Sequence, residues 1–261
     1  MICTRSTKMQ RVVVGLAFAK ALLLTTSCKT NDYQLAQVSG AQIQIDSSVQ
    51  DVATISTFIA PYKAKVDKEM NEPLSYNPSA MSKSDFPYNT PIGNLLAAMM
   101  REQATGVYKQ RTGKNIDVVL LNHGGIRAGL PAGAITMRNA FEVMPFENEL
   151  MVASITGSQM QELVDYMAAS SKAHPIDGLQ IILNKDKTLK TALVQGKPIN
   201  TAATYEVLTN DYLYNGGDSM NFFAGAPATA LDYKIRNAVI DYLRKTDTLR
   251  ASRDQRYYIE N

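Results

Sequence analysis

The residues best suited to chemistry follow the apolar run IDVVLL (residues 116–121), which is typical of a buried strand. An amide, two glycines and a guanidinium come directly after it, at Asn122, Gly124, Gly125 and Arg127. Glycine lets the backbone approach a ligand closely, and arginine presents a planar fork to phosphate or sugar oxygens. Taken alone, the same residues also fit a simple turn in which Arg127 pairs with a surface acid.

Two further stretches favour a binding site over a simple turn. LTNDYLYNGGDSM (residues 208–220) again runs from an apolar strand into glycines, and VMPFENEL (residues 143–150) holds Phe146 directly after a proline. Two rings can stack on both faces of a base, at about 1–3 kcal/mol per stacked base, and a carboxylate can accept hydrogen bonds from ribose hydroxyls. We therefore predict a nucleoside-binding cleft formed by Asn122, Arg127, Phe146, Tyr212 and Asp218, with loops contributed by Gly124, Gly125, Asn215, Gly216 and Gly217.

The helices that must position these residues are indicated by apolar periodicity. Ser47 and Ser48 can cap a first helix, whose apolar face consists of Val49, Val52, Ile55, Phe58, Ile59, Tyr62, Val66 and Met70. Further helices are predicted near Gly93, over residues 157–171 with a capping box from Ser158 and Gln161, and over residues 230–246.

Strands are predicted over residues 115–122, 148–156, 178–184, 191–200 and 204–213, with a hairpin turning at Gly196-Lys197. Helices and strands mix without a strict βαβ rhythm, so the predicted class is α+β, in one domain covering residues 47–261.

Residues 1–28 have the pattern of a secretion signal, with basic residues, the apolar run VVVGLAFA and small residues before Cys28. The stretch TTSC resembles a bacterial lipoprotein signal, in which the cysteine becomes the lipidated first residue. The alternative is ordinary secretion with Cys28 discarded. We predict a lipid-anchored protein of a bacterial cell envelope, with residues 29–46 as a polar tether and no other membrane-spanning segment.

The net charge of +3 belongs to the leader and does not indicate a nucleic-acid partner. Four of the 27 basic residues, and none of the 24 acidic ones, lie in residues 1–28. The remaining 23 basic residues form no run that could follow a polyanion, so we expect no nucleic-acid polymer as a ligand.

The stretches LNHGGIRAGLPAGAIT, VMPFENELMVASITG and YEVLTNDYLYNGGDSM resemble, in this order, successive motifs of the C-terminal domain of the 5'-nucleotidase family. The resemblance extends from the helix near residue 50 almost to the C-terminus. It implies a layered α/β domain that binds the nucleoside part of a nucleotide. Carried over by position, it makes Phe146 and Tyr212 the stacking aromatics, and Asn122, Arg127 and Asp218 polar contacts to base, ribose or phosphate.

Full-length members of that family begin with a metallophosphatase domain, whose two metals activate water and bind the phosphate. Its metal-binding motifs are rich in histidine, and this sequence has two histidines, His123 and His174. His123 is followed by Gly124 instead of an acid, and we expect His174, before Pro175, on a surface loop. We expect no catalytic residue, metal ligand or cofactor in this chain, and a di-metal site only in a partner chain.

Three functions are compatible with these observations. The leading hypothesis is a nucleotide-recognition chain that works with a separately encoded metallophosphatase in nucleotide catabolism. The first helix is then a candidate docking surface, although we expect most of its apolar face to pack onto its own domain. The second is a free-standing lipoprotein that binds nucleosides or nucleotides without catalysis. The third is an interaction scaffold with a decayed pocket, against which Phe146, Tyr212 and Asp218 argue.

Overall fold

The computed structural model describes residue 35 and residues 37–260, so the predicted leader with Cys28 lies outside the described residues. Residues 37–52 contain no helix or strand and are exposed. The predicted cap at Ser47 and Ser48 is wrong, because the helix begins only at Ala53; Ser48 instead donates from its backbone and its hydroxyl to Asp46, at 2.9 and 2.6 Å. The compact unit that holds the fold begins at Ala53.

The first described helix, α2 (Ala53–Met70), carries the predicted apolar stripe, but none of its residues is buried. Ile55, Phe58 and Tyr62 are 58%, 70% and 64% exposed. The expectation that most of this face packs onto the domain is therefore wrong. Only the last turn meets the domain, where Asp67 pairs with Arg138 of α4 (Met137–Val143) at 3.2 Å.

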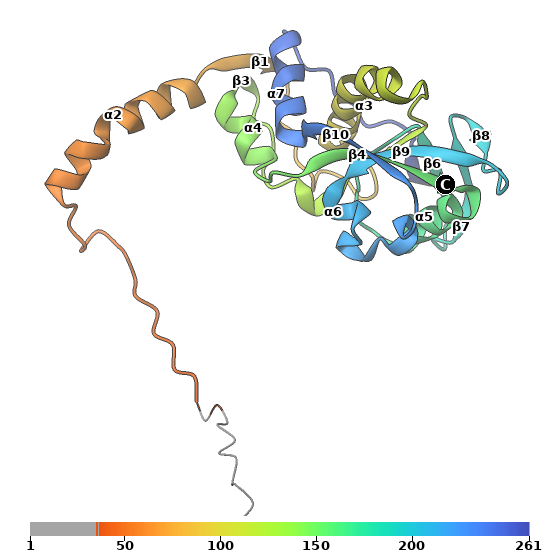
Figure 1. Ribbon diagram of the computed structural model, residues 1–261, viewed down its shortest axis with the longest axis horizontal. Helices are drawn as coiled ribbons and strands as arrows, with labels where there is room; N and C mark the ends of the chain where they lie inside the picture. The colour runs from red at the N-terminus through yellow and green to blue at the C-terminus, as the bar shows by residue number, and fades with distance from the viewer. Residues whose placement is uncertain (1–34, 36, 261) are drawn as a thin grey trace, which may run out of the picture. The chain divides into compact units, whose positions relative to one another are not determined.

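A five-stranded sheet forms the centre of the fold, in the order β10-β4-β9-β2-β5 (Figure 1). Its strands are β2 (Val118–Leu120), β4 (Glu149–Thr156), β5 (Ile176–Asp177), β9 (Thr204–Asn210) and β10 (Ala228–Lys234). The neighbours β2 and β9 run parallel, and every other pair in this sheet is antiparallel. This mixture of directions, with helices on both sides, agrees with the predicted α+β class.

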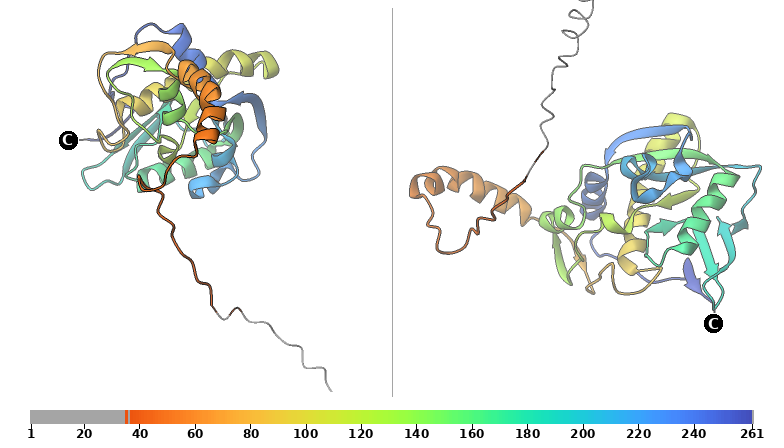
Figure 2. Two further views of the ribbon diagram at one scale, coloured as in Figure 1. Left: turned by 90° about the vertical axis from the view of Figure 1, so that its left-hand side faces the viewer. Right: turned by 90° about the horizontal axis from the view of Figure 1, so that it is seen from below.

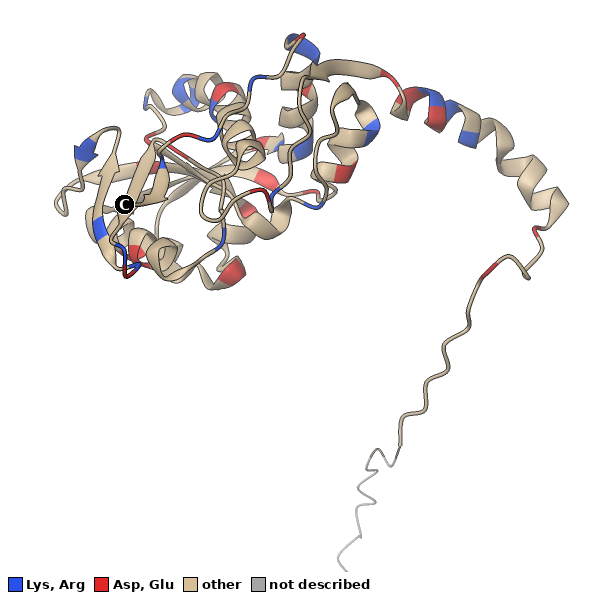
Figure 3. Cartoon of the chain, turned by 180° about the vertical axis from the view of Figure 1, so that it is seen from behind, with Lys and Arg blue, Asp and Glu red and all other residues tan. Residues whose placement is uncertain are grey.

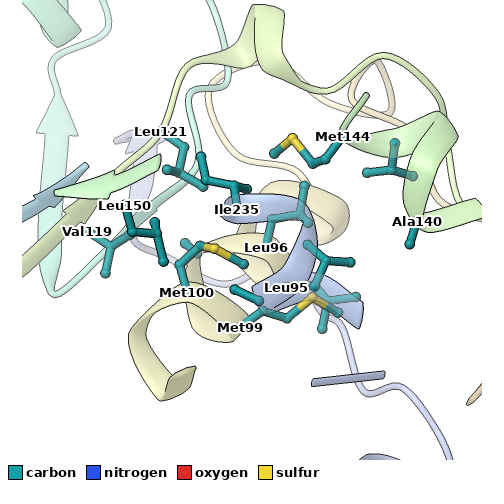
Figure 4. Packing of buried hydrophobic residues seen from close by; sticks show 14 of the residues in the cluster. Leu95, Leu96, Met99, Met100, Val119, Leu121, Ala140, Met144, Leu150 and Ile235 are labelled. Carbon is teal, nitrogen blue, oxygen red and sulfur yellow. The ribbon is translucent and has the colours of Figure 1, made fainter. Parts of the chain in front are cut away.

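Both faces of the central sheet are buried because its strands are apolar at successive positions. Val119 and Leu121 belong to one core, which α3 (Pro91–Thr112) and α7 (Ile235–Lys245) cover (Figure 4). Val118 and Leu120 belong to a second core on the opposite face, covered by α5 (Gly157–Ala169). Successive side chains of a strand point to opposite faces, so one apolar run supplies both cores.

A second sheet packs beside α5, in the order β11-β6-β7-β8, and includes the C-terminal strand (Figure 2). Its strands are β6 (Leu179–Leu183), β7 (Leu189–Val194), β8 (Lys197–Pro198) and β11 (Tyr257–Ile259). A third pair joins β1 (Pro73–Asn77) to β3 (Gly133–Thr136). Short turns complete the fold: α6 (Asp211–Tyr214), η1 (His123–Gly125), η2 (Gly217–Ser219) and η3 (Asn221–Phe223).

Three local predictions need correction. The hairpin turns at Gln195-Gly196, both with positive φ, because Lys197 already pairs with β7. The capping box of α5 consists of Thr156 and Gln159, two residues earlier than predicted. The predicted helix over residues 230–246 begins only at Ile235, because residues 228–234 pair with β4 as β10.

Basic and acidic residues are interspersed along the elements instead of being separated into single-sign tracks (Figure 3). No helix in the described ranges has the length and apolar content needed to cross a bilayer.

Candidate functional site

Seven residues from three separate parts of the chain line a cavity of about 400 Å³. They are Asn122, Gly124, Arg127, Phe146, Asn148, Tyr212 and Asp218. All five predicted contact residues are among them. Asn148 was missed, although it lies only two residues after Phe146 in a stretch that the sequence had singled out.

Strand direction explains why these residues meet. Asn122 follows the end of β2, and Tyr212 follows the end of β9, which pairs with β2 in parallel. Phe146 and Asn148 precede β4, which runs antiparallel to β9, so the start of β4 lies at the same edge. The cavity therefore forms where two strands end and a third begins.

The two aromatic rings of the cavity are only partly covered by the protein. Phe146 and Tyr212 are each 44% exposed, although large apolar side chains are usually buried. The guanidinium carbon of Arg127 lies 5.7 Å from the centroid of the Phe146 ring, a distance at which cation–π attraction operates. The rings are thus available to a planar ligand, beside a fixed positive charge.

Asp218 is held in place by two tyrosines. Tyr212 donates its hydroxyl to Asp218 Oδ1 at 2.9 Å, and Tyr166 donates to the backbone carbonyl of Asp218, also at 2.9 Å. Asp218 and Ser219 adopt positive φ values of 52° and 62°, which non-glycine residues rarely do. Such strain often accompanies functional sites, where the surrounding contacts maintain it.

Two glycines support the cavity by leaving room for its side chains. A Cβ at Gly217 would lie 2.5 Å from two ring carbons of Tyr212, and a Cβ at Gly125 would lie 2.9 Å from Asn122 Oδ1. Of the predicted loop residues, only Gly124 lines the cavity itself. Asn215 and Gly216 line a separate hollow of about 290 Å³.

One carboxylate oxygen joins the two ring-bearing segments. Asp211 Oδ1 accepts from the side chain of Asn148 at 2.8 Å, from the backbone N–H of Tyr212 at 2.8 Å, and from the N–H of Glu149 at 3.2 Å. The segment of Phe146 is thereby tied to the segment of Tyr212. The sequence signal for this role was the acid directly after the strand that becomes β9.

The turn at Asn122 rests on a buried histidine. His174 is 3% exposed, and its Nδ1 accepts the backbone N–H of His123 at 3.3 Å. Its predicted place on a surface loop is wrong, because it packs edge-on against the ring of Tyr166. Burial lowers the pKa of His174 to about 4, so the ring is neutral at pH 7. A neutral ring keeps Nδ1 free to accept.

In the part of the chain that the structure describes, no group of three or more His, Cys, Asp or Glu side chains is arranged to hold a metal ion. The cavity offers stacking faces, a guanidinium, a carboxylate and two amides. This set suits recognition of a planar, hydroxylated and anionic ligand.

Comparison with known proteins identifies the family of this chain. The family model of the 5'-nucleotidase C-terminal domain matches residues 65–225. Cell wall protein Lmo0130 of Listeria monocytogenes is 29% identical, over 71% of this chain and 26% of that protein. Protein UshA of Escherichia coli is 28% identical, over 67% of this chain and 30% of that protein. The chain thus spans less than a third of either relative.

Solved structures show the same fold. The 5'-nucleotidase precursor of Thermus thermophilus superposes with a TM-score of 0.66 at 21% identity, over 80% of this chain and 43% of that one. The NAD nucleotidase of Haemophilus influenzae superposes with a TM-score of 0.59 at 17% identity, over 80% and 42% of the two chains. The family match covers more than half of the sequence and confirms the resemblance seen in its motifs. The chain belongs to the family of 5'-nucleotidase C-terminal domains.

Proposed function

We propose that the cavity binds the nucleoside part of a nucleotide, and that a separately encoded metallophosphatase chain hydrolyses the phosphate in nucleotide catabolism. The observation that carries this proposal is the meeting of Phe146 with Tyr212 and Asp218, from two segments distant in sequence, around one cavity of about 400 Å³. A volume in this range suits a small-molecule ligand.

Each lining residue has a role that its chemistry supports. Phe146 and Tyr212 sandwich the base, at about 1–3 kcal/mol per stacked base. Asp218 accepts from the ribose hydroxyls, and Tyr212 orients its carboxylate from one side. Arg127 is exposed beside the Phe146 ring and reaches for phosphate or sugar oxygens. The amides of Asn122 and Asn148 contact the base or ribose.

A partner chain would supply the di-metal site. The histidine-rich metal motifs of the family's metallophosphatase domain do not occur in this sequence, whose histidines are His123 and His174. His174 accepts the backbone N–H of His123 through Nδ1. The exposed apolar stripe of α2 also supports a partner, since α2 lies where the segment joining the two halves of longer family members is expected.

The cell envelope of a bacterium is the proposed location. One relative is a cell wall protein, and the first 28 residues have the pattern of a lipoprotein leader that ends in Cys28. The alternative function, a free-standing nucleoside-binding lipoprotein without catalysis, uses the same cavity. This alternative differs from the leading proposal because it requires no partner that docks on the apolar stripe of α2.

Binding is tested by calorimetry with adenosine and AMP on the chain without residues 1–28. Phe146→Ala and Tyr212→Ala should each weaken adenosine binding by about 1–3 kcal/mol. Asp218→Ala should weaken adenosine more than adenine, because adenine has no ribose. If both ring variants bind adenosine as tightly as the unmodified chain, the stacked-base site is refuted.

Catalysis is tested by adding this chain to a separately encoded metallophosphatase chain that lacks this C-terminal domain, with Mn²⁺ and AMP. We expect the mixture to hydrolyse AMP with a lower KM or a higher kcat than the metallophosphatase alone. Unchanged KM and kcat, together with intact adenosine binding, would favour the free-standing binding protein.

A further inference from the structure

Arg236, in the first turn of α7, contacts the segment that carries Phe146. Its Nη1 donates to the backbone carbonyl of Pro145 at 3.0 Å and lies 3.5 Å from that of Phe146. Its Nη2 forms an ion pair with Glu147, and its guanidinium stacks over the ring of Phe141, 4.3 Å from the centroid. One side chain thus touches three consecutive residues, Pro145 to Glu147, and a ring of α4.

The position of Arg236 is unfavourable for α7 itself. The N-terminus of a helix carries partial positive charge, so a cation in the first turn is disfavoured there. The arginine side chain is also only 11% exposed, and burial of a charge costs free energy unless it is paired. Helix stability therefore does not account for Arg236, whereas its contacts to residues 145–147 do.

The start of α7 also holds the next residue of the same segment. The backbone N–H of Ile235 donates to the carbonyl of Asn148 at 3.0 Å. Asn148 lines the cavity, and its side chain reaches Asp211. The segment from Pro145 to Asn148 is therefore fixed at both ends by α7, with Arg236 at the end that carries the ring.

The backbone of Phe146 must be held by other residues, because the ring itself is only partly packed against the protein. The ring is 44% exposed, and the guanidinium carbon of Arg127 lies 5.7 Å from its centroid. The place of the ring is thus set by its backbone. Stacking requires the two ring planes to stay at a fixed separation, so a shift of the Phe146 backbone weakens the sandwich.

We infer that Arg236 is a positioning residue for the base-stacking ring of Phe146. Arg236 does not line the cavity and acts on the ligand only through Phe146. The inference rests on the proposed nucleoside site. A lysine at this position would keep the charge. It would lose the planar stack on Phe141, and it could not bind the Pro145 carbonyl and the Glu147 carboxylate with two separate nitrogens of one planar group.

The test is a double-mutant cycle on adenosine affinity, measured by calorimetry, with Tm recorded for each variant. Arg236→Gln should weaken binding by roughly five- to twentyfold, and Arg236→Lys by less, since it keeps one donor to the carbonyls. Arg244→Gln, at an exposed arginine of the last turn of α7, is the matched control and should bind like the unmodified chain.

The double variant of Arg236 and Phe146 shows whether Arg236 acts on the ligand through Phe146 or independently of it. If Arg236 acts through Phe146, then Arg236→Gln added to Phe146→Ala should change affinity by less than about twofold. Losses that multiply in the double variant would overturn the inference, as would an unaltered affinity in Arg236→Gln. If Phe146→Ala and Tyr212→Ala also bind normally, the proposed nucleoside site itself fails. Should Arg236→Gln not fold, Arg236→Lys and Glu147→Gln complete the same cycle.

Discussion

Acid should weaken this domain through His174, which supports the backbone at His123. The ring is buried, its Nδ1 accepts the N–H of His123, and burial lowers its pKa to about 4 from an ordinary value of 6.5. Protonation would place a charge in the interior and remove the acceptor. The unfolded chain binds this proton more readily than the folded one, so stability falls as the pH drops from 6.5 towards 4.

The size of the effect follows from the two pKa values. A pKa of about 4 in the folded state against 6.5 in the unfolded state corresponds to about 3 kcal/mol, of which about 2 kcal/mol is lost by pH 5. Burial also lowers the pKa of the neighbouring His123, so His123 contributes with the same sign. The comparison must therefore isolate His174.

His174→Asn provides that comparison. The asparagine Oδ1 can accept the His123 N–H in place of the ring nitrogen, but it does not titrate in this range. Urea unfolding at pH 7 and pH 5 should show the unmodified chain losing about 2 kcal/mol more than His174→Asn between the two conditions. Equal losses in the two proteins would refute the assignment of this acid sensitivity to His174.

Further predictions concern the glycines, the ribose contact and α2. Gly125→Ala should displace Asn122 and weaken adenosine binding severalfold in calorimetry, whereas Gly106→Ala in α3, whose Cβ would meet nothing within 4 Å, should bind normally. Asp218→Asn should reduce the preference for adenosine over 2',3'-dideoxyadenosine; an unaltered preference would remove its role. Phe58→Glu should abolish stimulation of the metallophosphatase while leaving adenosine affinity intact, and full stimulation by this variant would exclude α2 as the docking surface.

Much of the site was predictable because each of its parts is a local pattern. An apolar run marks a strand, and the polar residues and glycines after it mark the strand end, so Asn122, Tyr212 and Asp218 could be singled out one stretch at a time. Proline and glycine made the Phe146 and Tyr212 turns recognisable. Asn148 was not predicted, because an asparagine before a strand can have many roles. Only the tertiary structure shows that it lines the cavity and donates a hydrogen bond to Asp211.

Predictions failed where distant residues override local preference. Residues 230–234 have helical periodicity, yet they pair with β4, because the central sheet has an edge available to them. His174 stands in a polar stretch before Pro175, yet the ring of Tyr166 and the turn at His123 enclose it. The exposure of the α2 stripe belongs to the same class, because a sequence pattern shows an apolar face but not what covers it.

The sequence by itself determined most of the helices and strands, the motifs of the family and the side chains available for a nucleoside, since these depend on neighbours along the chain. Only the tertiary structure decided that β2 and β9 lie side by side in parallel, with the start of β4 next to them, so that three loops share one cavity. It also decided that Asp211, His174 and Arg236 contact the segments that carry the cavity residues. The reason is that strand pairing and burial depend on contacts between residues far apart in sequence, which no local spacing encodes.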